Sequence, residues 1–247
     1  MHITNASILG VPVAQATMEQ VLNWVEKRIE AGQPPAHLVT ANAEIIYRAS
    51  WDAGLAGLLS KADMITADGA GVVWAGKKIH TPFPERVTGV DLTMGLLALA
   101  EKKGWKVYFL GAKPEAVEKA VLRVLSQYPQ LEICGYHHGY FPKQEIDQVV
   151  SNIYKVEPHL LFVALGVPRQ EQFIQENFSQ LAVPVSIGVG GTFDVLAGIV
   201  NRAPRWMQKW GLEWLYRLLK EPRRFVRILA LPRFTWAVWR QSRATRQ

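Results

Sequence analysis

The sequence predicts an α/β protein with a Rossmann-like, mainly parallel sheet, flanking helices and a basic helical appendage at the C-terminus. Through residues 1–200, short apolar runs of strand composition alternate with amphipathic helical patterns, an order typical of parallel α/β sheets. Most of these runs end at a glycine or a polar residue, as strand-to-helix turns do. From Asn201 the chain becomes basic and rich in tryptophan.

Apolar spacing and turn residues place the elements of the N-terminal part. Thr17 has the character of a helix N-cap, and Asn42 follows a buried apolar run. Residues 77–87 contain two prolines and mixed charges, so we expect a loop there. The predicted elements are a strand pair at 3–13, a helix at 17–31, a strand at 37–41, a helix beyond Asn42, a short helix at 55–61, a strand at 62–67 and a helix at 72–75.

The remainder of the first 200 residues repeats the alternation. Gly111 closes an apolar run, and Pro114 suits the first turn of the helix that follows. A glycine between a strand and a helix N-terminus is a candidate phosphate site. The predicted elements are a helix opening at 88–91, strands at 106–111, 131–136, 159–166 and 183–188, and helices beginning near 113, 145, 168 and 192.

The stretch 65–71, Ile-Thr-Ala-Asp-Gly-Ala-Gly, organises the functional prediction. It has the pattern of a strand, a sharp turn and a helix, and Asp68 stands at the turn. In open α/β sheets, ligands bind at the carboxyl ends of the strands. Asp68 is therefore either a helix N-cap or a general base, because an aspartate is ordinarily ionised at neutral pH and can accept a proton.

The composition of the chain predicts the class of protein and its cellular compartment. The 247 residues fit one globular domain with an appendage, and we expect a core at 1–200 and an appendage at 201–247. The single cysteine, Cys134, lies in an apolar run and predicts a buried thiol. The N-terminus lacks the pattern of a signal peptide, and no run reaches the roughly 18 apolar residues of a membrane span. A cytoplasmic protein is expected.

The appendage carries the basic character of the chain. Residues 201–247 hold 12 Lys/Arg and 2 Asp/Glu, a net charge of +10, whereas the whole chain carries +7, so residues 1–200 stand at −3. Trp206, Trp210 and Trp214 follow at a spacing of four, and Trp236 and Trp239 are assigned to a second apolar side together with Phe234. Basic, tryptophan-rich amphipathic helices suit an anionic membrane surface. Packing on the core is the other interpretation; both stay open for 204–220, whereas the membrane interpretation is favoured for 222–246.

Several enzyme classes lack their motifs. The sequence contains no G-x-G-x-x-G, no Walker A sequence and no D-x-D. The six histidines show no metal-ligand spacing apart from the adjacent pair His137 and His138, so we predict neither a metal nor a cofactor. Arginine can then neutralise a leaving diphosphate, because its guanidinium is always charged and binds oxygens in pairs.

The residues also resemble a known family, the WecG/TagA/CpsF glycosyltransferases, which build teichoic acids, enterobacterial common antigen and capsular or exopolysaccharides. The resemblance covers nearly the whole chain, and its specificity lies in the order and number of short motifs. The matching motifs are Thr40-Ala-Asn-Ala-Glu, Thr66-Ala-Asp-Gly, Arg86-Val-Thr-Gly-Val-Asp, Phe109-Leu-Gly, Gly139-Tyr-Phe, Leu165-Gly-Val-Pro-Arg-Gln-Glu, Gly188-Val-Gly-Gly-Thr-Phe-Asp, Arg202-Ala-Pro, and Trp210-Gly-Leu-Glu-Trp with Arg217 and Glu221-Pro222.

This resemblance implies an inverting, metal-independent enzyme. It would move a sugar, most often N-acetylmannosamine, from a UDP donor to polyprenyl-diphosphate-linked N-acetylglucosamine at the inner face of the membrane. The resemblance gives Asp68 the role of base and assigns Thr40 and Asn42 to the sugar. It assigns Arg86 and Gln170 to the donor, and Arg217, Arg224 and Arg227 to the closing appendage. Gly111, Tyr140, Gly190, Gly191 and Asp194 would form the UDP pocket.

Alternatives remain open at the level of sequence. The same family includes other donors, such as UDP-glucose, UDP-N-acetylglucosamine and UDP-N-acetylmannosaminuronic acid. A nucleic-acid-binding protein could use the basic, aromatic appendage, although the negative core argues against this and we expect no nucleic-acid partner. A Rossmann oxidoreductase is a further alternative. The resemblance also suggests self-association of the chain.

Overall fold

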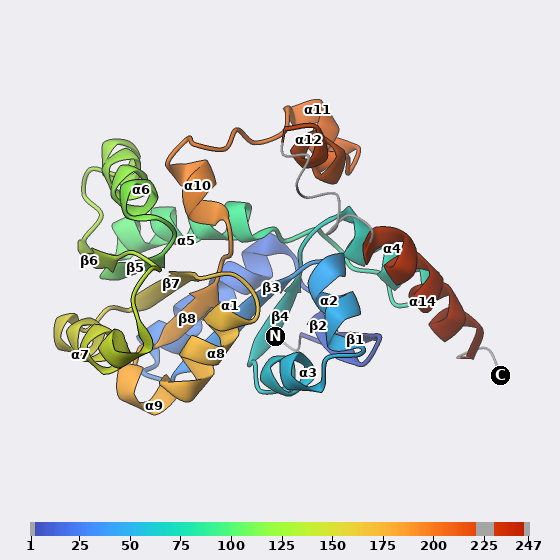
Figure 1. Ribbon diagram of the computed structural model, residues 1–247, viewed down its shortest axis with the longest axis horizontal. Coiled ribbons are helices and arrows are strands. Elements are labelled where there is room, and N and C mark those ends of the chain that lie inside the picture. Colours follow the sequence, from blue (N-terminus) through green and yellow to red (C-terminus); the bar gives the residue numbers. More distant parts are fainter. Residues whose placement is uncertain (1–2, 221–229, 245–247) are drawn as a thin grey trace.

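The computed structural model describes residues 3–220 and 230–244, and its centre is one six-stranded parallel sheet (Figure 1). The strand order is β4-β3-β8-β7-β5-β6, so the predicted mainly parallel sheet is confirmed. The strands are β3 (Ala36–Ala41), β4 (Met64–Ala67), β5 (Val107–Gly111), β6 (Ile133–His137), β7 (Leu160–Ala164) and β8 (Val185–Gly188).

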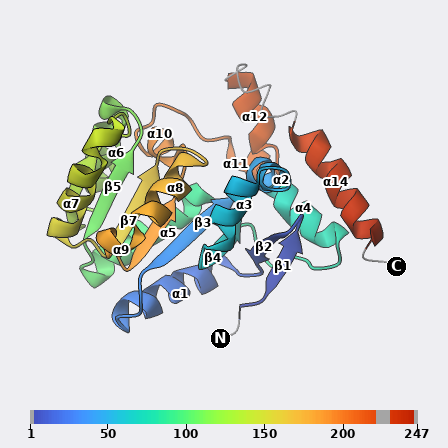
Figure 2. The same ribbon diagram turned by 60° about the horizontal axis from the view of Figure 1, so that its bottom comes forward.

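Helices cover both faces of this sheet (Figure 2). The chain order alternates strands with helices, which places the carboxyl ends of the strands at one edge. The helices are α1 (Met18–Glu30), α2 (Ala43–Ala49), α3 (Ala53–Ser60), α4 (Ala70–Lys78), α5 (Gly89–Lys103), α6 (Pro114–Gln127), α7 (Ile146–Val156), α8 (Arg169–Glu176), α9 (Phe178–Leu181), α10 (Thr192–Leu196), α11 (Arg205–Lys209), α12 (Glu213–Lys220) and α14 (Ala230–Ala244), with a 3-10 turn η1 (Lys143–Glu145).

Alternation along the strands divides the core between the two faces. In β3, Leu38 packs in the cluster with α1, α5, α6 and α10, whereas its neighbour Val39 packs on the opposite side. That opposite side holds two clusters, one with α2, α3 and α4 and one with α7, α8 and α9. Fully buried strands of this kind have continuous apolar runs, which is why they could be predicted from the sequence.

The N-terminal strand pair is confirmed as a hairpin of β1 (Asn5–Ile8) and β2 (Val11–Ala14) around Gly10. The predicted loop at 77–87 is wrong at its start, because α4 continues through Lys78. Gly76 does not end the helix. It lets the ring of Phe83 fold back against α4, since a Cβ on Gly76 would lie only 2.5 Å from that ring.

The first part of the appendage contains two short helices rather than one. Figure 1 shows α11 and α12 together at the top of the molecule. Between them Gly211 has a left-handed backbone, with φ of +71°, so the four-residue spacing of Trp206, Trp210 and Trp214 does not form one helical stripe. A Cβ on Gly211 would lie 2.6 Å from the Cβ of Ala70, so this turn touches the first residue of α4.

Helix α14 packs on the core through a face that the sequence analysis did not identify. It lies beside α2 and α4 (Figures 1 and 2). Its buried residues are Phe234, Val238 and Ser242, at helical spacing of four. Trp236 and Trp239 are 59% and 38% exposed, so assigning them to the side of Phe234 is wrong.

Gln241 adds polar contacts between α14 and the hairpin. Its side-chain amide donates to the carbonyl of Ser7 at 2.8 Å, and its side-chain oxygen accepts from the N–H of Leu9 at 2.9 Å. In the part of the chain that the structure describes, none of the helices is both long enough and apolar enough to cross a membrane.

Candidate active site

Most of the polar residues singled out in the sequence follow the carboxyl ends of the sheet strands. Thr40 lies within β3, and Asn42 and Asp68 directly follow β3 and β4. Gly111 ends β5, and the turn after β8 contains Gly190. Since parallel strands end at one edge, the fold brings these residues to the edge where ligands bind in open α/β sheets.

Asp68 is held at the N-terminus of α5. Its Oδ2 accepts a hydrogen bond from the backbone N–H of Gly89 at 3.2 Å, and its own N–H donates to the carbonyl of Ala41. The N-cap of α4 is Gly69, which makes no side-chain cap bond, so the interpretation of Asp68 as the cap of the following helix is wrong. A helix N-terminus carries a partial positive charge and suits a carboxylate as its partner.

Thr40 and Asn42 flank Asp68 on the neighbouring strand. The Thr40 hydroxyl donates to the carbonyl of Gly188 at 3.1 Å. A Cβ on Gly89 would lie 3.0 Å from Thr40 Oγ1 and 3.7 Å from Asp68 Oδ2, so both side chains face the same glycine. The Asn42 side-chain oxygen accepts from the N–H of Ile45 and caps α2.

Gln170 joins the turns that follow β7 and β8. It is 2% exposed, and its Oε1 accepts from the backbone N–H of Gly166 at 3.2 Å and of Gly190 at 3.1 Å. Its Nε2 donates to Oε1 of Glu171 at 2.8 Å. In this arrangement the Gln170 amide holds two turns of the site together.

Glu171 is a functional candidate that the sequence analysis did not single out. The side chain is fully buried, and its Oε2 has no hydrogen-bond partner among the residues that the structure describes. Burial raises the pKa of this carboxyl to about 7, against the opposing effect of the bond from Gln170. No local sequence pattern indicates the burial of Glu171, because polar residues are common in the first turn of a helix.

The turns after β5 and β6 lie against each other. Gly111 has φ of +126°, and a Cβ there would lie 2.4 Å from the carbonyl oxygen of Ala164. The N–H of Gly139 donates to the carbonyl of Ala112 at 2.8 Å. Tyr140 follows Gly139 and is 67% exposed, so its ring is accessible at this end of the edge.

The turn after β8 leads into α10 through two glycines. Gly190 has φ of +53°, and Gly191 is the N-cap residue of α10. A Cβ on Gly191 would lie 4.0 Å from a carboxylate oxygen of Asp194. These three residues therefore form one compact turn, next to the amide of Gln170.

Arg86 contacts the appendage. Its Nη1 donates to Oε2 of Glu213 at 2.6 Å, and Oε1 of Glu213 accepts from Nε of Arg202 at 3.3 Å. Arg202 also binds both carboxylate oxygens of Asp91, at 2.5 and 2.7 Å. Although burial opposes it, this pairing holds the pKa of Asp91 below its usual range.

The three appendage arginines expected to close the site differ in where they lie. Arg217 belongs to α12, and Arg224 and Arg227 lie outside the described residues. Among residues 3–220 and 230–244, no three His, Cys, Asp or Glu side chains gather as metal ligands would.

A Rossmann-like sheet with an acid and several glycine turns at its carboxyl edge places this chain among the α/β proteins that bind ligands at that edge, a class that hosts many different reactions. The comparison with known proteins makes this specific. Residues 6–247 match the model of the Glycosyl transferase WecG/TagA/CpsF family. The chain belongs to this family and is a glycosyltransferase.

Relatives with an assigned activity cover almost the full chain. One from Bacillus subtilis (strain 168) is 34% identical over 96% of this chain and 92% of its own length, and one from Bacillus spizizenii is 40% identical over 85% and 81%. One from Staphylococcus aureus (strain MW2) is 34% identical over 98% and 95%. Each is named N-acetylglucosaminyldiphosphoundecaprenol N-acetyl-beta-D-mannosaminyltransferase.

Proposed function

We propose that this chain transfers N-acetylmannosamine from UDP-N-acetylmannosamine to N-acetylglucosamine carried on a polyprenyl diphosphate, with inversion and without a metal ion. The observation that carries the proposal is the place of Asp68, whose carboxylate meets the N-terminus of α5 beside Thr40. The names of the relatives supply the sugar and the acceptor.

In the proposed reaction, Asp68 accepts the proton of the acceptor hydroxyl while that oxygen attacks the anomeric carbon of the donor sugar. The bond between that carbon and the UDP oxygen breaks, and UDP leaves with the electron pair. A single direct displacement needs one base and inverts the configuration. Glycosidases, by contrast, usually use two carboxylates.

Charge develops on the leaving diphosphate, and arginines are suited to stabilise it. We assign this role to Arg86 from the core and to Arg217, Arg224 and Arg227 from the appendage. Gly111, Tyr140, Gly190, Gly191 and Asp194 complete the UDP pocket in this proposal, Gln170 belongs to the donor site with Arg86, and Thr40 and Asn42 bind the sugar. Residues 1–200 would thus supply the base, and residues 201–247 would close the site.

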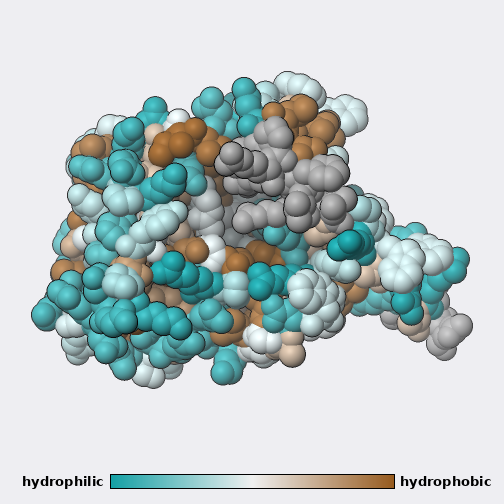
Figure 3. All heavy atoms as spheres, in the orientation of Figure 1, coloured by the Kyte–Doolittle hydropathy of each residue, from teal (hydrophilic) through white to brown (hydrophobic). Residues whose placement is uncertain are grey.

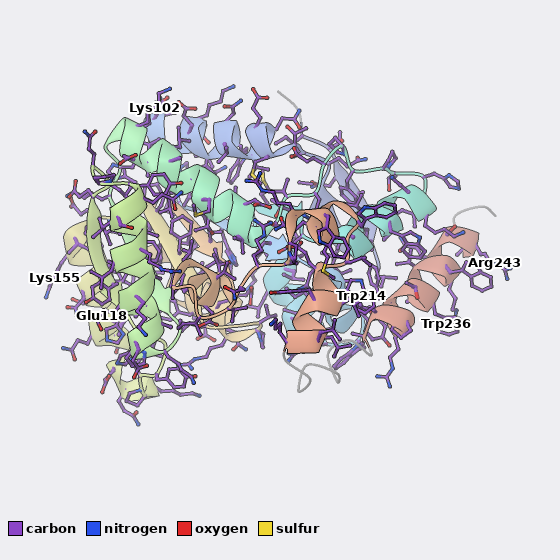
Figure 4. The ribbon with its side chains drawn as sticks, turned by 90° about the horizontal axis from the view of Figure 1, so that it is seen from above. Lys102, Glu118, Lys155, Trp214, Trp236 and Arg243 are labelled. Carbon is purple, nitrogen blue, oxygen red and sulfur yellow. The ribbon has the colours of Figure 1, made fainter. Side chains whose placement is uncertain are left out.

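The outer face of α14 supports a peripheral position at the inner face of the cell membrane. Trp236 and Trp239 are exposed, and the guanidinium groups of Arg240 and Arg243 lie 4.8 and 3.6 Å from their respective ring centroids. In Figure 4, Trp236 and Arg243 project from α14 away from the sheet. Aromatic and basic side chains on one helix face suit the interface of an anionic membrane.

Figure 3 adds a second feature of this surface. Hydrophobic side chains gather at the top of that view, over α12 and the segment after α10. Leu219 of α12 is 70% exposed and Ile199 is 55% exposed. An apolar area next to the site is where a lipid-linked acceptor would approach in the proposed function.

The test is UDP release by the full-length protein from a panel of UDP-sugars, with a short-chain polyprenyl-diphosphate-N-acetylglucosamine acceptor and a chelator. We expect release that depends on the acceptor and is fastest with UDP-N-acetylmannosamine, and a product of inverted anomeric configuration by NMR. Preference for another UDP-sugar would correct the donor. Release only after addition of a divalent cation would refute metal independence, and no release from any UDP-sugar would refute the proposed reaction.

A further inference from the structure

Four charged side chains form a chain of ion pairs from the appendage to the core. Arg86 and Asp91 belong to the core, and Arg202 and Glu213 to the appendage. Glu213 binds one guanidinium with each of its two oxygens. Each side chain is at least partly shielded, with exposed fractions of 22% for Arg86 and 18% for Glu213. Shielded pairs of this kind are screened less by solvent than surface pairs.

The two arginines in this chain have different contacts. Arg202 is anchored without Glu213, because it binds both oxygens of Asp91. Arg86, by contrast, contacts Glu213 through Nη1, and a guanidinium has five N–H donors in one plane. A bond at Nη1 restrains the guanidinium while leaving further donors of the same group for another anion. Glu213 therefore determines how the Arg86 guanidinium is presented.

This contact lies close to the candidate base. Arg86 precedes Thr88, the N-cap of α5, and the N–H of Gly89 donates to Asp68. The Thr88 hydroxyl also donates to Asp91 at 2.7 Å, which ties the ion-pair chain to the same helix N-terminus. A side chain of the appendage thus reaches the loop that leads into the Asp68 contact.

We propose that Glu213 is a positioning residue for donor binding, which orients the Arg86 guanidinium for the diphosphate before the donor arrives. The inference rests on the proposed function, since it takes the diphosphate of a nucleotide as the ligand of Arg86. Arginine loses much rotamer freedom when it is fixed. If Glu213 already restrains Arg86, the side chain loses less conformational entropy when the diphosphate binds. Loss of Glu213 therefore weakens UDP binding by about five- to ten-fold.

The experiment is a double-mutant cycle on the full-length protein, with UDP as the probe and calorimetry as the readout. The variants are Glu213→Ala, Arg86→Ala and the pair, and the matched control is Glu118→Ala, an exposed glutamate of α6 labelled in Figure 4. We expect Glu213→Ala to weaken UDP binding in the wild-type background and to have no further effect beside Arg86→Ala. Glu213→Gln, which keeps an acceptor oxygen for Arg86, should recover most of the loss.

The outcomes separate this inference from the proposed function. If the wild type binds UDP and Glu213→Ala weakens binding equally in both backgrounds, Glu213 acts through something other than Arg86 and the inference is wrong. Tighter binding by Glu213→Ala would also overturn it, because Glu213 would then compete with the diphosphate. Failure of the wild type to bind UDP would refute the proposed function itself.

Discussion

Trp105 of the core and the five tryptophans of the appendage lie in opposite environments, although Trp51 and Trp74 of the core are also exposed, at 66% and 39%. Trp105, in the core, is 5% exposed and packs among apolar side chains. The five tryptophans of the appendage are between 38% and 79% exposed, while Phe234 and Val238 make the buried contacts of α14. Hydrophobicity alone therefore does not say which side of a basic helix meets the core. Aromatic rings stacked under arginines remain at the surface, where they can meet a partner.

Truncating one side chain from each face of α14 should give the largest difference between buried and exposed aromatic residues. Phe234→Ala should destabilise the protein by about 3–5 kcal/mol, because the ring is fully buried in the cluster of α2, α3 and α4. Trp236→Ala should change the free energy of unfolding by less than about 0.5 kcal/mol, as exposed positions do. Denaturant unfolding measures both. Equal effects of the two variants would contradict the packing of α14 described here.

A buried carboxyl provides the next largest effect. Burial raises the pKa of Glu171 to about 7, so the folded protein holds a proton there that the unfolded chain has lost above its ordinary value near 4.5. The stability that this group contributes is therefore lost as pH rises from about 4 to 8. Glu171→Gln should be more stable than the wild type at pH 8, by up to about 3 kcal/mol, and similar to it at pH 4.

The measurement is denaturant unfolding of both proteins across this pH range. Glu176→Gln is the matched control, since Glu176 lies on the same helix and is exposed. A constant difference between wild type and Glu171→Gln at every pH would show that the carboxyl does not titrate in this range.

The smallest expected effect concerns the outer face of α14. Arg240→Gln with Arg243→Gln should weaken binding to anionic vesicles by about five-fold per arginine, because a cation near such a surface contributes about 1 kcal/mol. Co-sedimentation with anionic and zwitterionic vesicles measures it. The control pair is Lys102→Gln with Lys155→Gln, which lie on α5 and α7, away from α14 (Figure 4). Equal losses in both pairs would mean that net charge, and not this face, governs binding.

The strands and turns of the core could be predicted because the sequence patterns that indicate them are local. Each buried strand is a short apolar run, and the turn at Asp68 combines an acid with two glycines. The hydrogen bond between Asp68 and Gly89 could not be predicted, since Gly89 follows 21 residues later and belongs to another helix. The resemblance pointed to Gln170, but its bonds to two separate turns depend on the sheet order.

The appendage was harder for two physical reasons. Gly211 breaks the apparent stripe of three tryptophans by adopting a left-handed backbone. The buried face of α14 includes Ser242, a polar residue that masks the four-residue spacing of Phe234 and Val238. The pair of Arg86 and Glu213 joins positions 127 residues apart, and no spacing rule links them.

In the proposed function Asp68 acts as the base of a direct glycosyl transfer, and this role is tested by comparing the turnover of wild type and Asp68→Asn with UDP-N-acetylmannosamine and the lipid-linked acceptor. Asparagine keeps an oxygen for the N–H of Gly89 but cannot take the proton. We predict that kcat falls by about 10³-fold, within the range for loss of a general base, while UDP binding stays unchanged. If the turnover of Asp68→Asn stays within about ten-fold of the wild type, well short of that range, Asp68 is not the base.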